Sequence, residues 1–377
     1  MVTVGLSGGV DSSVAALLLQ QQGYAVSAVF MKNWEEDDAH GLCPAATDYR
    51  DAAAVAATLG LPLQAVSFAD YYWDRVFTPF LAAYAEGRTP NPDVFCNREI
   101  KFDAFLEYAL ARGARYIATG HYARSVQQDG IWRLQKGLDP NKDQSYFLYY
   151  LGQKALAHTL FPVGALAKAE VRRQAATAAL VTHGKKDSTG ICFIGERPFR
   201  EFLARYLPAK PGPLVTPAGE EVGSHDGMMY YTLGQRHGLR LGGRRGDNGA
   251  PWYVVAKDVA TNTLVVARDH DHPLLYRVSL VAADIAWVAG VCPRLPLSCQ
   301  AKVRYRQEDQ ACVVAAHGDD QVLVTFSVPQ RALTPGQSVV FYQGEECLGG
   351  GVIATDTPSM GNQDSRESPP PRSAWHE

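Results

Sequence analysis

The first third of the chain alternates between short apolar runs and helical patterns, and this alternation restricts the fold more than any other feature. Val2–Leu6 is an apolar run, and a glycine turn and a helical stretch over Asp11–Gln22 follow it. The further predicted strands are Ala25–Met31, Leu63–Phe68 and Tyr116–Thr119, and the further helices are Asp48–Leu59, Asp70–Glu86 and Asn97–Arg112. This rhythm predicts an α/β domain, a parallel sheet with helices on both faces, which binds ligands beyond the carboxyl ends of its strands. Gly8, Gly9 and Gly120 all follow predicted strands.

From about Gly195 onward the pattern changes to short strands separated by glycine and proline turns. A hairpin is predicted over Tyr253–Lys257 and Thr263–Ala267, and Lys302–Gln307 alternates as an exposed strand does. Further short strands are predicted at Val313–Ala315, Val322–Phe326, Val339–Tyr342 and Gly350–Ile353, which together indicate a small barrel. We therefore expect a catalytic α/β domain over 1–200, a β-rich central domain over 201–272, a C-terminal β-barrel over 273–355 and a disordered tail over 356–377.

Composition excludes several classes of protein. The chain has 377 residues, of which 46% are apolar and 20% charged, and no run approaches the roughly 18 to 20 apolar residues of a membrane helix. The N-terminus reads as a strand, not as a signal or transit peptide, so we expect a soluble cytoplasmic protein. The seven cysteines are scattered without a CxxC pair or zinc spacing, which argues against a secreted disulfide framework. A net charge of −3 leaves a nucleic-acid partner undecided, because a local basic surface can supply phosphate contacts.

The stretch LSGGVDSS over residues 6–13 joins the first strand to the first helix. Its glycines allow a tight turn whose N–H groups can face an anion, Ser7, Ser12 and Ser13 add hydroxyl donors, and Asp11 could hold a Mg²⁺ ion on the phosphates. A serine-capped glycine turn is the alternative. No Lys-Ser/Thr pair follows, so this is not a Walker A loop. SGGVDS at this place is similar to the PP-loop of the ATP pyrophosphatases, which cleave ATP to AMP and pyrophosphate while adenylating a substrate.

Two cysteines have unusual surroundings. Cys96 follows Pro90 and Pro92, just before a predicted helix, where the helix dipole would favour its thiolate, and Asp93 could act as a proton donor or acceptor. The alternative is that Asp93 caps the helix and Cys96 is a packed thiol. Cys192 lies in DSTGICFIG between glycines, which suggests a mobile loop suited to carrying a persulfide. The alternative there is a buried strand, residues 191–194, with an inert cysteine.

Ten strings occur in a fixed order: SGGVDSS, TPNPDVFCN, KFDAFL, ATGHYAR, NKDQSYFLY, DSTGICFIG, YTLGQRHGL, VRYRQ, TPGQSVVFY and CLGGG. With them the chain resembles the bacterial tRNA-specific 2-thiouridylases of the MnmA family, over residues 1 to about 354. The resemblance implies an adenine nucleotide alpha-hydrolase-like N-terminal domain. It also implies ATP-dependent replacement of the C2 oxygen of the wobble uridine by sulfur, with ATP and Mg²⁺ bound. The partners that it implies are tRNAs for Lys, Glu and Gln and a persulfide donor, either a cysteine desulfurase or a sulfur carrier protein.

The same resemblance implies roles for individual residues. ATP would lie on Gly5, Leu6, Ser7, Gly8, Gly9, Val10, Asp11 and Ser12, with Met31 beside the adenine and Gly120 close by. The target base would contact Asn91, Pro92 and Asp93. Cys192 would carry the persulfide, and Cys96 would attack it or close a disulfide with Cys192 after transfer. The implied tRNA contacts are His121, Lys142, Asp143, Gln144, Arg304, Tyr305 and Gln337.

Structural roles compete with several of these functional ones. His121 can be a structural histidine at a strand end, residues 142–144 a solvated turn, and Arg304 part of an exposed strand face. Phe95, Tyr122 and Tyr146 could stack on the base, although core packing is expected for at least two of them. The competing functions are an amide-forming ligase of the PP-loop class and a non-catalytic, ATP-dependent RNA-binding protein. A sulfur relay uses two cysteines on separate segments, whereas a ligase needs neither.

Overall fold

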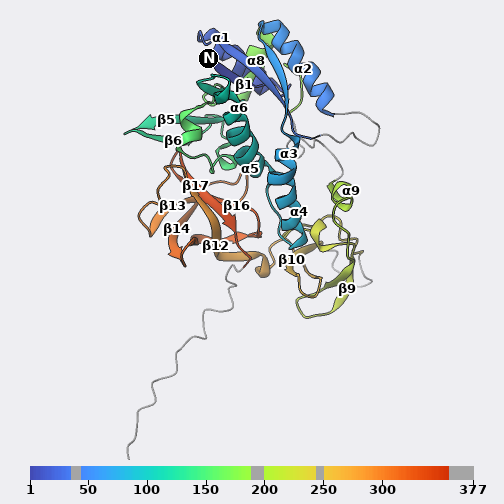
Figure 1. Cartoon of the computed structure of the whole chain (residues 1–377). Helices are drawn as coiled ribbons and strands as arrows, with labels where there is room; N and C mark the ends of the chain where they lie inside the picture. The colour runs from blue at the N-terminus through green and yellow to red at the C-terminus, as the bar shows by residue number, and fades with distance from the viewer. Residues whose placement is uncertain (35–43, 188–198, 243–249, 356–377) are drawn as a thin grey trace, which may run out of the picture.

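The computed structural model describes residues 1–34, 44–187, 199–242 and 250–355. Figure 1 shows an α/β unit at the top, with a β-barrel and a smaller β-rich unit below it. Cys192 and the predicted tail over 356–377 lie outside the described residues. Within the described ranges, no helix combines the length and the apolar character that crossing a bilayer requires.

The α/β unit contains the predicted parallel sheet. Its strands are β1 (Val2–Gly5), β2 (Val26–Lys32), β3 (Leu63–Ser67), β4 (Tyr116–Ala118) and β7 (Thr159–Leu160), in the order β3-β2-β1-β4-β7 with every neighbour parallel. The chain leaves β1 towards β2 on one side and returns to β4 on the other. The gap between the carboxyl ends of β1 and β4 is therefore a topological switch point, where such sheets bind ligands.

Helices cover both faces of this sheet, as the sequence predicts. One face packs against α1 (Val10–Gln21), α2 (Pro44–Leu59) and α8 (Lys168–Thr177), whose apolar side chains meet Leu6, Ala28 and Phe30. The other face packs against the π-helical η2 (Asn97–Ala104) and α6 (Phe105–Ala111), where Phe105 meets Val29 and Met31. Two further helices of this unit are α7 (Gln153–Ala157) and the 3₁₀ turn η3 (Ser145–Phe147).

A helical rod leads from the sheet to the two β-rich units. It consists of α3 (Ala69–Tyr72), the π-helical η1 (Trp73–Phe77) and α4 (Thr78–Ala85), and Figure 1 shows it descending from β3 towards the central unit. Phe77 and Phe80 of the rod contact Phe202 and Phe199 of α9 (Phe199–Ala204). The rod ends just before the segment that leads through Thr89 into α5 (Pro92–Cys96).

The C-terminal unit is the predicted β-barrel. Its six strands are β12 (Tyr276–Trp287), β13 (Leu297–Lys302), β14 (Gln310–His317), β15 (Gln321–Arg331), β16 (Ser338–Gln343) and β17 (Glu346–Ile353). They close because β12 pairs with both β15 and β17. The hairpin of β5 (Ala123–Gln128) and β6 (Ile131–Lys136) extends this sheet, since Leu134 pairs with Cys347. The barrel and the α/β unit therefore share one hydrophobic cluster, which contains both Cys96 and Tyr342.

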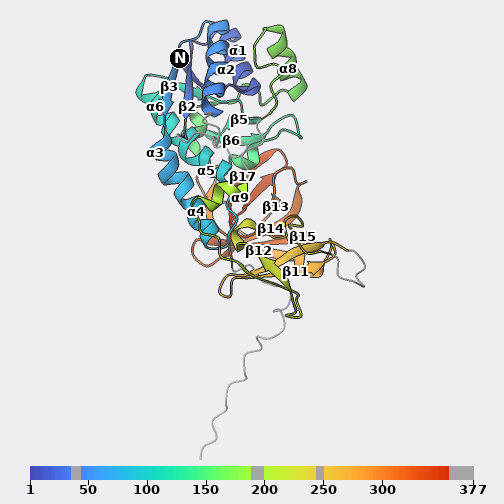
Figure 2. The same ribbon diagram turned by 90° about the vertical axis from the view of Figure 1, so that its right-hand side faces the viewer.

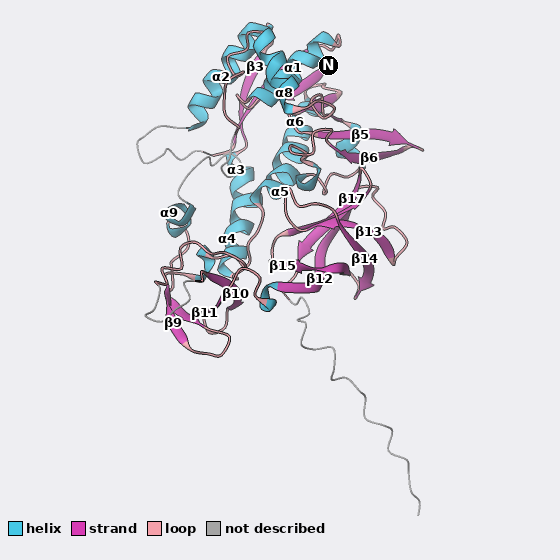
Figure 3. Ribbon diagram, turned by 180° about the vertical axis from the view of Figure 1, so that it is seen from behind, coloured by secondary structure: helices cyan, strands magenta, loops and turns pink. Residues whose placement is uncertain are grey.

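The central unit is a four-stranded sheet of order β10-β11-β8-β9. Its strands are β8 (Gly212–Val215), β9 (Glu221–His225), β10 (Trp252–Asp258) and β11 (Thr263–Arg268), with short 3₁₀ turns at η4 (Met228–Tyr230) and η5 (Pro273–Leu275). The predicted hairpin is confirmed, because β10 and β11 pair in antiparallel register. Figures 2 and 3 show this unit beside the barrel at the end of α4. Lys257 joins it to the turn that follows the rod by donating to the carbonyl of Gly87 at 3.0 Å.

Two local predictions are wrong. Strand β13 ends at Lys302, and the predicted strand over Lys302–Gln307 is a turn in which the N–H of Val303 donates to Gln307 Oε1 at 2.9 Å and Arg306 has a φ of 67°. The helix expected to begin after Cys96 begins at Pro92 instead. Its cap is therefore Asn91, not Asp93.

Gly120 allows the first helix to approach the end of β4. A Cβ atom on Gly120 would lie 2.6 Å from the backbone nitrogen of Ser12 and 2.7 Å from the carbonyl carbon of Asp11. Because both contacts are backbone, we predict that Gly120→Ala lowers the free energy of unfolding by about 1–3 kcal/mol, measured by urea denaturation. The control is Gly152→Ala, where a Cβ meets nothing within 4 Å and should cost less than about 1 kcal/mol. Equal losses in the free energy of unfolding for the two variants would contradict the claim that Gly120 is needed for the close approach of the first helix.

Candidate nucleotide and RNA site

The turn between β1 and α1 forms the first part of the site and requires glycine at its tightest point. Gly8 has a φ of +73°, and a Cβ atom there would lie 2.2 Å from the backbone oxygen of Asp48. Both the left-handed backbone and the close approach exclude a side chain. Ser12 holds the turn in place, because its Oγ accepts from the N–H of Ser7 at 3.2 Å and donates to the carbonyl of Gly9 at 3.1 Å.

The amide groups of this turn are available to an anion. Among the residues that the structure describes, no protein group accepts from the N–H groups of residues 8–11. Gly9 is the extended N-cap of α1, so these amides lie at the positive end of the helix dipole, which is a favourable place for a phosphate. Leu6 is buried beneath the turn, and Met31 packs against Gly5 at the neighbouring strand end.

Asp11 is neutralised by a lysine from another helix. Lys168 Nζ, at the start of α8, lies 2.8 Å from each carboxylate oxygen of Asp11. The Tyr122 hydroxyl donates to Asp11 Oδ1 at 2.7 Å. Burial, together with the charge of Asp11, raises the pKa of Tyr122, so this hydroxyl remains protonated and keeps donating.

Asp11 fits a Mg²⁺ ion that arrives with phosphates rather than a preformed metal centre. No group of three or more His, Cys, Asp or Glu side chains is placed to hold a metal ion in the described ranges. Protein-bound Mg²⁺ is commonly held by one or two carboxylates, by substrate phosphates and by water. One carboxylate beside phosphate-binding amides meets that requirement, provided that Lys168 gives up its place on Asp11.

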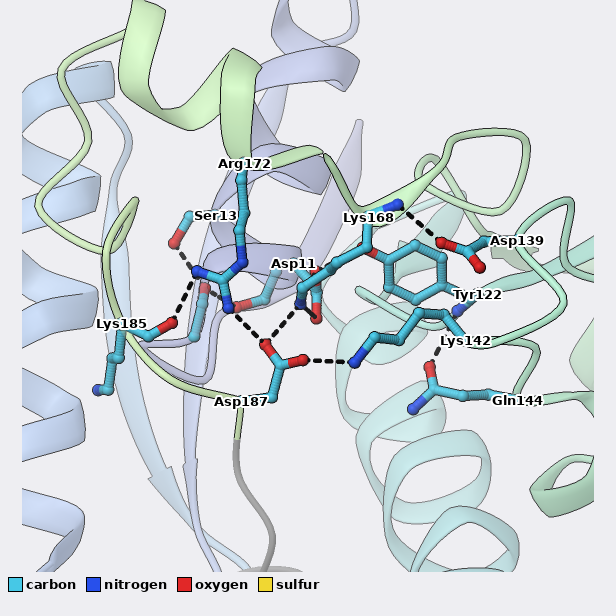
Figure 4. Close-up of polar contacts among 12 residues, drawn as sticks. Asp11, Ser13, Tyr122, Asp139, Lys142, Gln144, Lys168, Arg172, Lys185 and Asp187 are labelled. Atoms are coloured by element: carbon cyan, nitrogen blue, oxygen red, sulfur yellow. Dashed lines mark hydrogen bonds and ion pairs between the residues drawn. The ribbon is translucent and has the colours of Figure 1, made fainter. Parts of the chain in front are cut away.

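Asp187 gathers three cations at the same turn (Figure 4). Its Oδ2 accepts from Lys142 Nζ at 2.6 Å, and its Oδ1 lies 2.7 Å from Lys168 Nζ and 2.9 Å from Arg172 Nη2. Partial burial opposes ionisation, but hydrogen bonds from Lys142 and Lys168 outweigh it and hold the pKa of Asp187 at about 2. Asp187 is therefore charged at neutral pH, and with Asp11 it supplies two negative charges against three positive ones.

A fourth cation approaches the turn from the other side. Lys185 Nζ donates to the carbonyl of Gly8 at 2.9 Å and to Asp48 Oδ1 at 2.8 Å, and it also pairs with Asp51. Asp48 and Asp51 belong to α2. These ion pairs therefore fasten α2 to the turn at the point where Gly8 touches Asp48.

The barrel holds the segment that the family resemblance predicts to contact the target base. Gln337 Nε2 donates to the carbonyl of Thr89 at 2.7 Å, and the N–H of Thr89 donates to the carbonyl of Pro335 at 2.9 Å. Asn91 Oδ1 accepts from the N–H of Asp93 at 3.1 Å and of Val94 at 3.4 Å, which starts α5. The structure thus places Gln337 close to the segment of Asn91, Pro92 and Asp93.

Cys96 is the last residue of α5 and has no exposed surface. It belongs to the hydrophobic cluster that also contains Val94 and Phe102. The packed and the chemical hypotheses for Cys96 both stand as predictions. Its proposed partner, Cys192, lies outside the described residues.

Three residues predicted to contact tRNA have structural partners. His121 is 8% exposed, and a 2.7 Å hydrogen bond joins its Nδ1 to Thr119 Oγ1. Gln144 Oε1 accepts from the N–H of Tyr122 at 2.9 Å. Asp143 is buried and accepts from the N–H of Gly137 and from both the N–H and the hydroxyl of Ser145. These contacts shape the turn over residues 142–144, and Lys142 is its cation that reaches Asp187.

The barrel turn of Arg304 and Tyr305 packs against the chain that follows Lys142. The ring centroid of Tyr305 lies 4.5 Å from that of Phe147, while Arg304 is exposed and donates to the carbonyls of Arg331 and Ala332. The two predicted tRNA-contact segments are therefore neighbours, although they are distant in the sequence.

Core packing accounts for two of the three aromatic residues considered as stacking platforms. Tyr122 and Tyr146 are each 2% exposed, and both hydroxyls are engaged, since Tyr146 donates to the carbonyl of Ser338 at 2.9 Å. Phe95 is half-buried.

Sequence reasoning missed Lys168, Arg172 and Asp187. Lys168 and Arg172 are four residues apart on α8, so their side chains share one face, but many exposed helices carry such pairs. Asp187 immediately precedes the segment containing Cys192, and nothing in its local pattern identifies its partners. Only the fold brings these residues to the turn.

Three domain families match consecutive parts of the chain. A tRNA methyl transferase HUP domain matches residues 1–196, a tRNA methyl transferase PRC-barrel domain matches 200–268, and an aminomethyltransferase beta-barrel domain matches 277–353. The tRNA-specific 2-thiouridylase MnmA of Nitrosococcus oceani is 60% identical over 362 residues, which cover 96% of this chain and 98% of that protein. The proteins of the same name from Methylococcus capsulatus and Yersinia pestis are each 60% identical, and each match covers 93% of this chain and 95% of the relative.

His121 provides a pH test of the site. Burial, with a smaller effect of Lys101, holds the pKa of His121 well below its usual value of 6.5. The unfolded chain therefore binds a proton that the folded chain rejects, so stability falls as the pH drops below about 6.5, by up to about 1.4 kcal/mol per pH unit. We predict that His121→Asn, which can keep the hydrogen bond to Thr119, loses less stability than the wild type between pH 7 and pH 5 in urea denaturation. Parallel pH profiles would contradict a neutral, buried His121.

Proposed function

The chain belongs to the MnmA family of tRNA-specific 2-thiouridylases, and we propose that it uses ATP to replace the C2 oxygen of the wobble uridine in tRNA with sulfur. The products would be 2-thiouridine, AMP and pyrophosphate. The observation that carries the nucleotide part is the turn over residues 8–11 at the switch point of the sheet. Its backbone amides meet no acceptor in the described part of the chain, and Lys168 and Arg172 lie nearby.

ATP would lie along this turn. The amides of residues 8–11 would bind its phosphates, Gly120 would allow the nucleotide close to the backbone, and Met31 would border the adenine. Lys168 and Arg172 would neutralise the phosphates, and Asp11 would hold Mg²⁺, which supplies further charge neutralisation when bound. Uridine O2 is a poor leaving group. Its attack on the α-phosphorus would release pyrophosphate and convert O2 into part of AMP, a good leaving group.

Sulfur would then replace AMP at C2. The terminal sulfur of a Cys192 persulfide would attack C2 directly, or Cys96 would attack the persulfide and release hydrosulfide as the nucleophile. In the direct route AMP would leave C2, and Cys96 would then attack Cys192 Sγ, breaking the persulfide S–S bond so that the terminal sulfur stays on C2. In both routes a Cys96–Cys192 disulfide would form, which a thiol reductant must reduce before the next turnover. Asp93, three residues before Cys96, would act as the proton donor or acceptor in these sulfur-transfer steps.

The uridine must leave its stack to reach this chemistry, which is easiest in a single-stranded anticodon loop. Asn91, Pro92 and Asp93 would contact the base. Contacts to the rest of the tRNA would come from His121, Lys142, Asp143, Gln144, Arg304, Tyr305 and Gln337, with the buried members acting by shaping their segments. We propose tRNAs for Lys, Glu and Gln as substrates, a cysteine desulfurase or sulfur carrier protein as donor, and the cytoplasm, where these substrates occur, as the place of action.

Two domain descriptions name a methyl transferase, whereas the full-length relatives are named thiouridylases. The phosphate-binding turn supports an ATP-dependent reaction. A PP-loop ligase would also use that turn, but it would not depend on both Cys96 and Cys192.

We predict ATP-dependent formation of 2-thiouridine in unmodified tRNA incubated with the protein, Mg²⁺ and a persulfide source, detected by mass analysis of nucleosides. Cys96→Ser and Cys192→Ser should each lower the rate at least about 100-fold, because each removes a sulfur that the relay requires. Cys292→Ser is the matched control. Its thiol is exposed and assigned no role, so its rate should equal that of the wild type.

Consumption of ATP to AMP without any thiolated nucleoside would favour the ligase alternative. Retained thiolation in both serine variants would overturn the sulfur relay. If the wild type and the two serine variants bind RNA with the same affinity and none of them turns over ATP, the chain is a non-catalytic RNA-binding protein.

A further inference from the structure

The three cations that meet Asp187 come from separate parts of the fold. Lys168 and Arg172 lie on α8, which packs against α1, whereas Lys142 lies in the turn predicted to contact tRNA. Asp187 reaches Lys142 with one carboxylate oxygen and the two α8 cations with the other. Figure 4 shows Arg172 and Lys168 reaching this one carboxylate from above and Lys142 reaching it from the side.

The second anion in the network is Asp11, which Lys168 Nζ contacts at 2.8 Å. A continuous chain of ion pairs therefore runs from Asp11 through Lys168 and Asp187 to Lys142. Its first member, Asp11, lies in the phosphate-binding turn over residues 8–11. Its last member, Lys142, lies in the turn over residues 142–144, which we call the RNA-contact turn. Each link is a direct contact of 2.6–2.8 Å.

The backbone around this chain is fixed independently of it. Asp139 Oδ2 accepts from the N–H of Lys168 at 3.0 Å, and the carbonyl of Asp139 accepts from the N–H groups of Lys142 and Asp143 at 3.0 and 2.8 Å. The start of α8 and the turn over residues 142–144 thus stay joined through Asp139. The lysine and arginine side chains can then exchange one anion for another without a change of fold.

We propose that Asp187 is a positioning residue, an internal counter-anion that holds Lys168 and Arg172 ready for the phosphates of ATP and yields them when ATP binds. This inference rests on the proposed function. The phosphates compete with Asp187 for the two α8 cations. Asp187 then keeps Lys142 as its remaining partner, so nucleotide binding strengthens the anchor of the RNA-contact turn.

Loss of the negative charge of Asp187 should change ATP affinity and turnover with tRNA in opposite directions. A residue with a merely structural role would not produce that result. Removing the charge of Asp187 takes away its competition with the phosphates for Lys168 and Arg172, while Asp11 still pairs with Lys168, so affinity for ATP should rise. The same change removes the anchor of Lys142, so turnover with tRNA should fall. A residue that only stabilises the fold would weaken nucleotide binding and turnover together.

The test is calorimetric binding of α,β-methylene ATP with Mg²⁺ to the full chain, together with kcat for 2-thiouridine formation. We expect Asp187→Asn to bind the analogue about threefold to tenfold more tightly and to lower kcat about tenfold, because one competing charge is lost in a partly screened cluster. AMP, with a single phosphate, should show a smaller gain in affinity. Asp187→Glu keeps the charge and should bind the analogue as the wild type does.

Asp309→Asn is the matched control. Asp309 also lies between two cations, Lys136 at 2.5 Å and Lys302 at 3.6 Å, and its side chain is exposed to a similar degree, 28% against 32% for Asp187. It should leave the affinity for the analogue unchanged.

Equal or weaker binding of the analogue by Asp187→Asn would overturn the inference, as would tighter binding by Asp187→Glu as well. If either of these results is found while the wild type binds the analogue and forms 2-thiouridine, the proposed function stands and only the inference about Asp187 falls. If the wild type binds no nucleotide and forms no 2-thiouridine, both fall.

Discussion

The site depends on one close contact of backbone with backbone, at the point where β1 and β4 diverge. Gly120 lies against the first turn of α1, so near that its Cβ would be 2.6 Å from the nitrogen of Ser12. This approach holds the first turn of α1 at the switch point of the sheet. It also carries Tyr122, two residues further on, within 2.7 Å of Asp11. Gly120, just after β4, thus allows α1 to begin this close to the strand end and brings Asp11, its first acidic residue, to Tyr122.

Around that turn the protein supplies its own counter-ions. Lys142, Lys168, Arg172 and Lys185 face Asp11, Asp187, Asp48 and Asp51, so four positive charges oppose four negative ones. Binding a polyphosphate in such a cluster is an exchange of anions. Grouping like charges without these partners would cost stability through their repulsion. The aspartates therefore keep the cations together, and their arrangement determines which cations a ligand can reach.

The sheet, the barrel and the glycine turn between β1 and α1 were predictable because each leaves a local signal: alternating strands and helices, short strands between glycines, and SGGVDS. The predictions that failed, and the contacts that were missed, depend on interactions that the local sequence pattern does not show. Residues 302–307 alternate like a strand, yet the side chain of Gln307 folds back onto the N–H of Val303 and makes a turn. The pairing of Leu134 with Cys347 and the three cations on Asp187 join segments that are far apart or unpatterned, so only tertiary structure reveals them. The identity of the tRNAs that react leaves no such signal.

The central claim is that the turn over residues 8–11 and the start of α8 form one polyphosphate site. Amide hydrogen exchange followed by mass spectrometry, with and without α,β-methylene ATP and Mg²⁺, tests it directly, because bound phosphate would protect amides that no group among the described residues accepts from. The account predicts slower exchange in peptides covering residues 7–13 and 166–173, with little change in the strands of the barrel. Binding of the nucleotide without protection of the turn would contradict it.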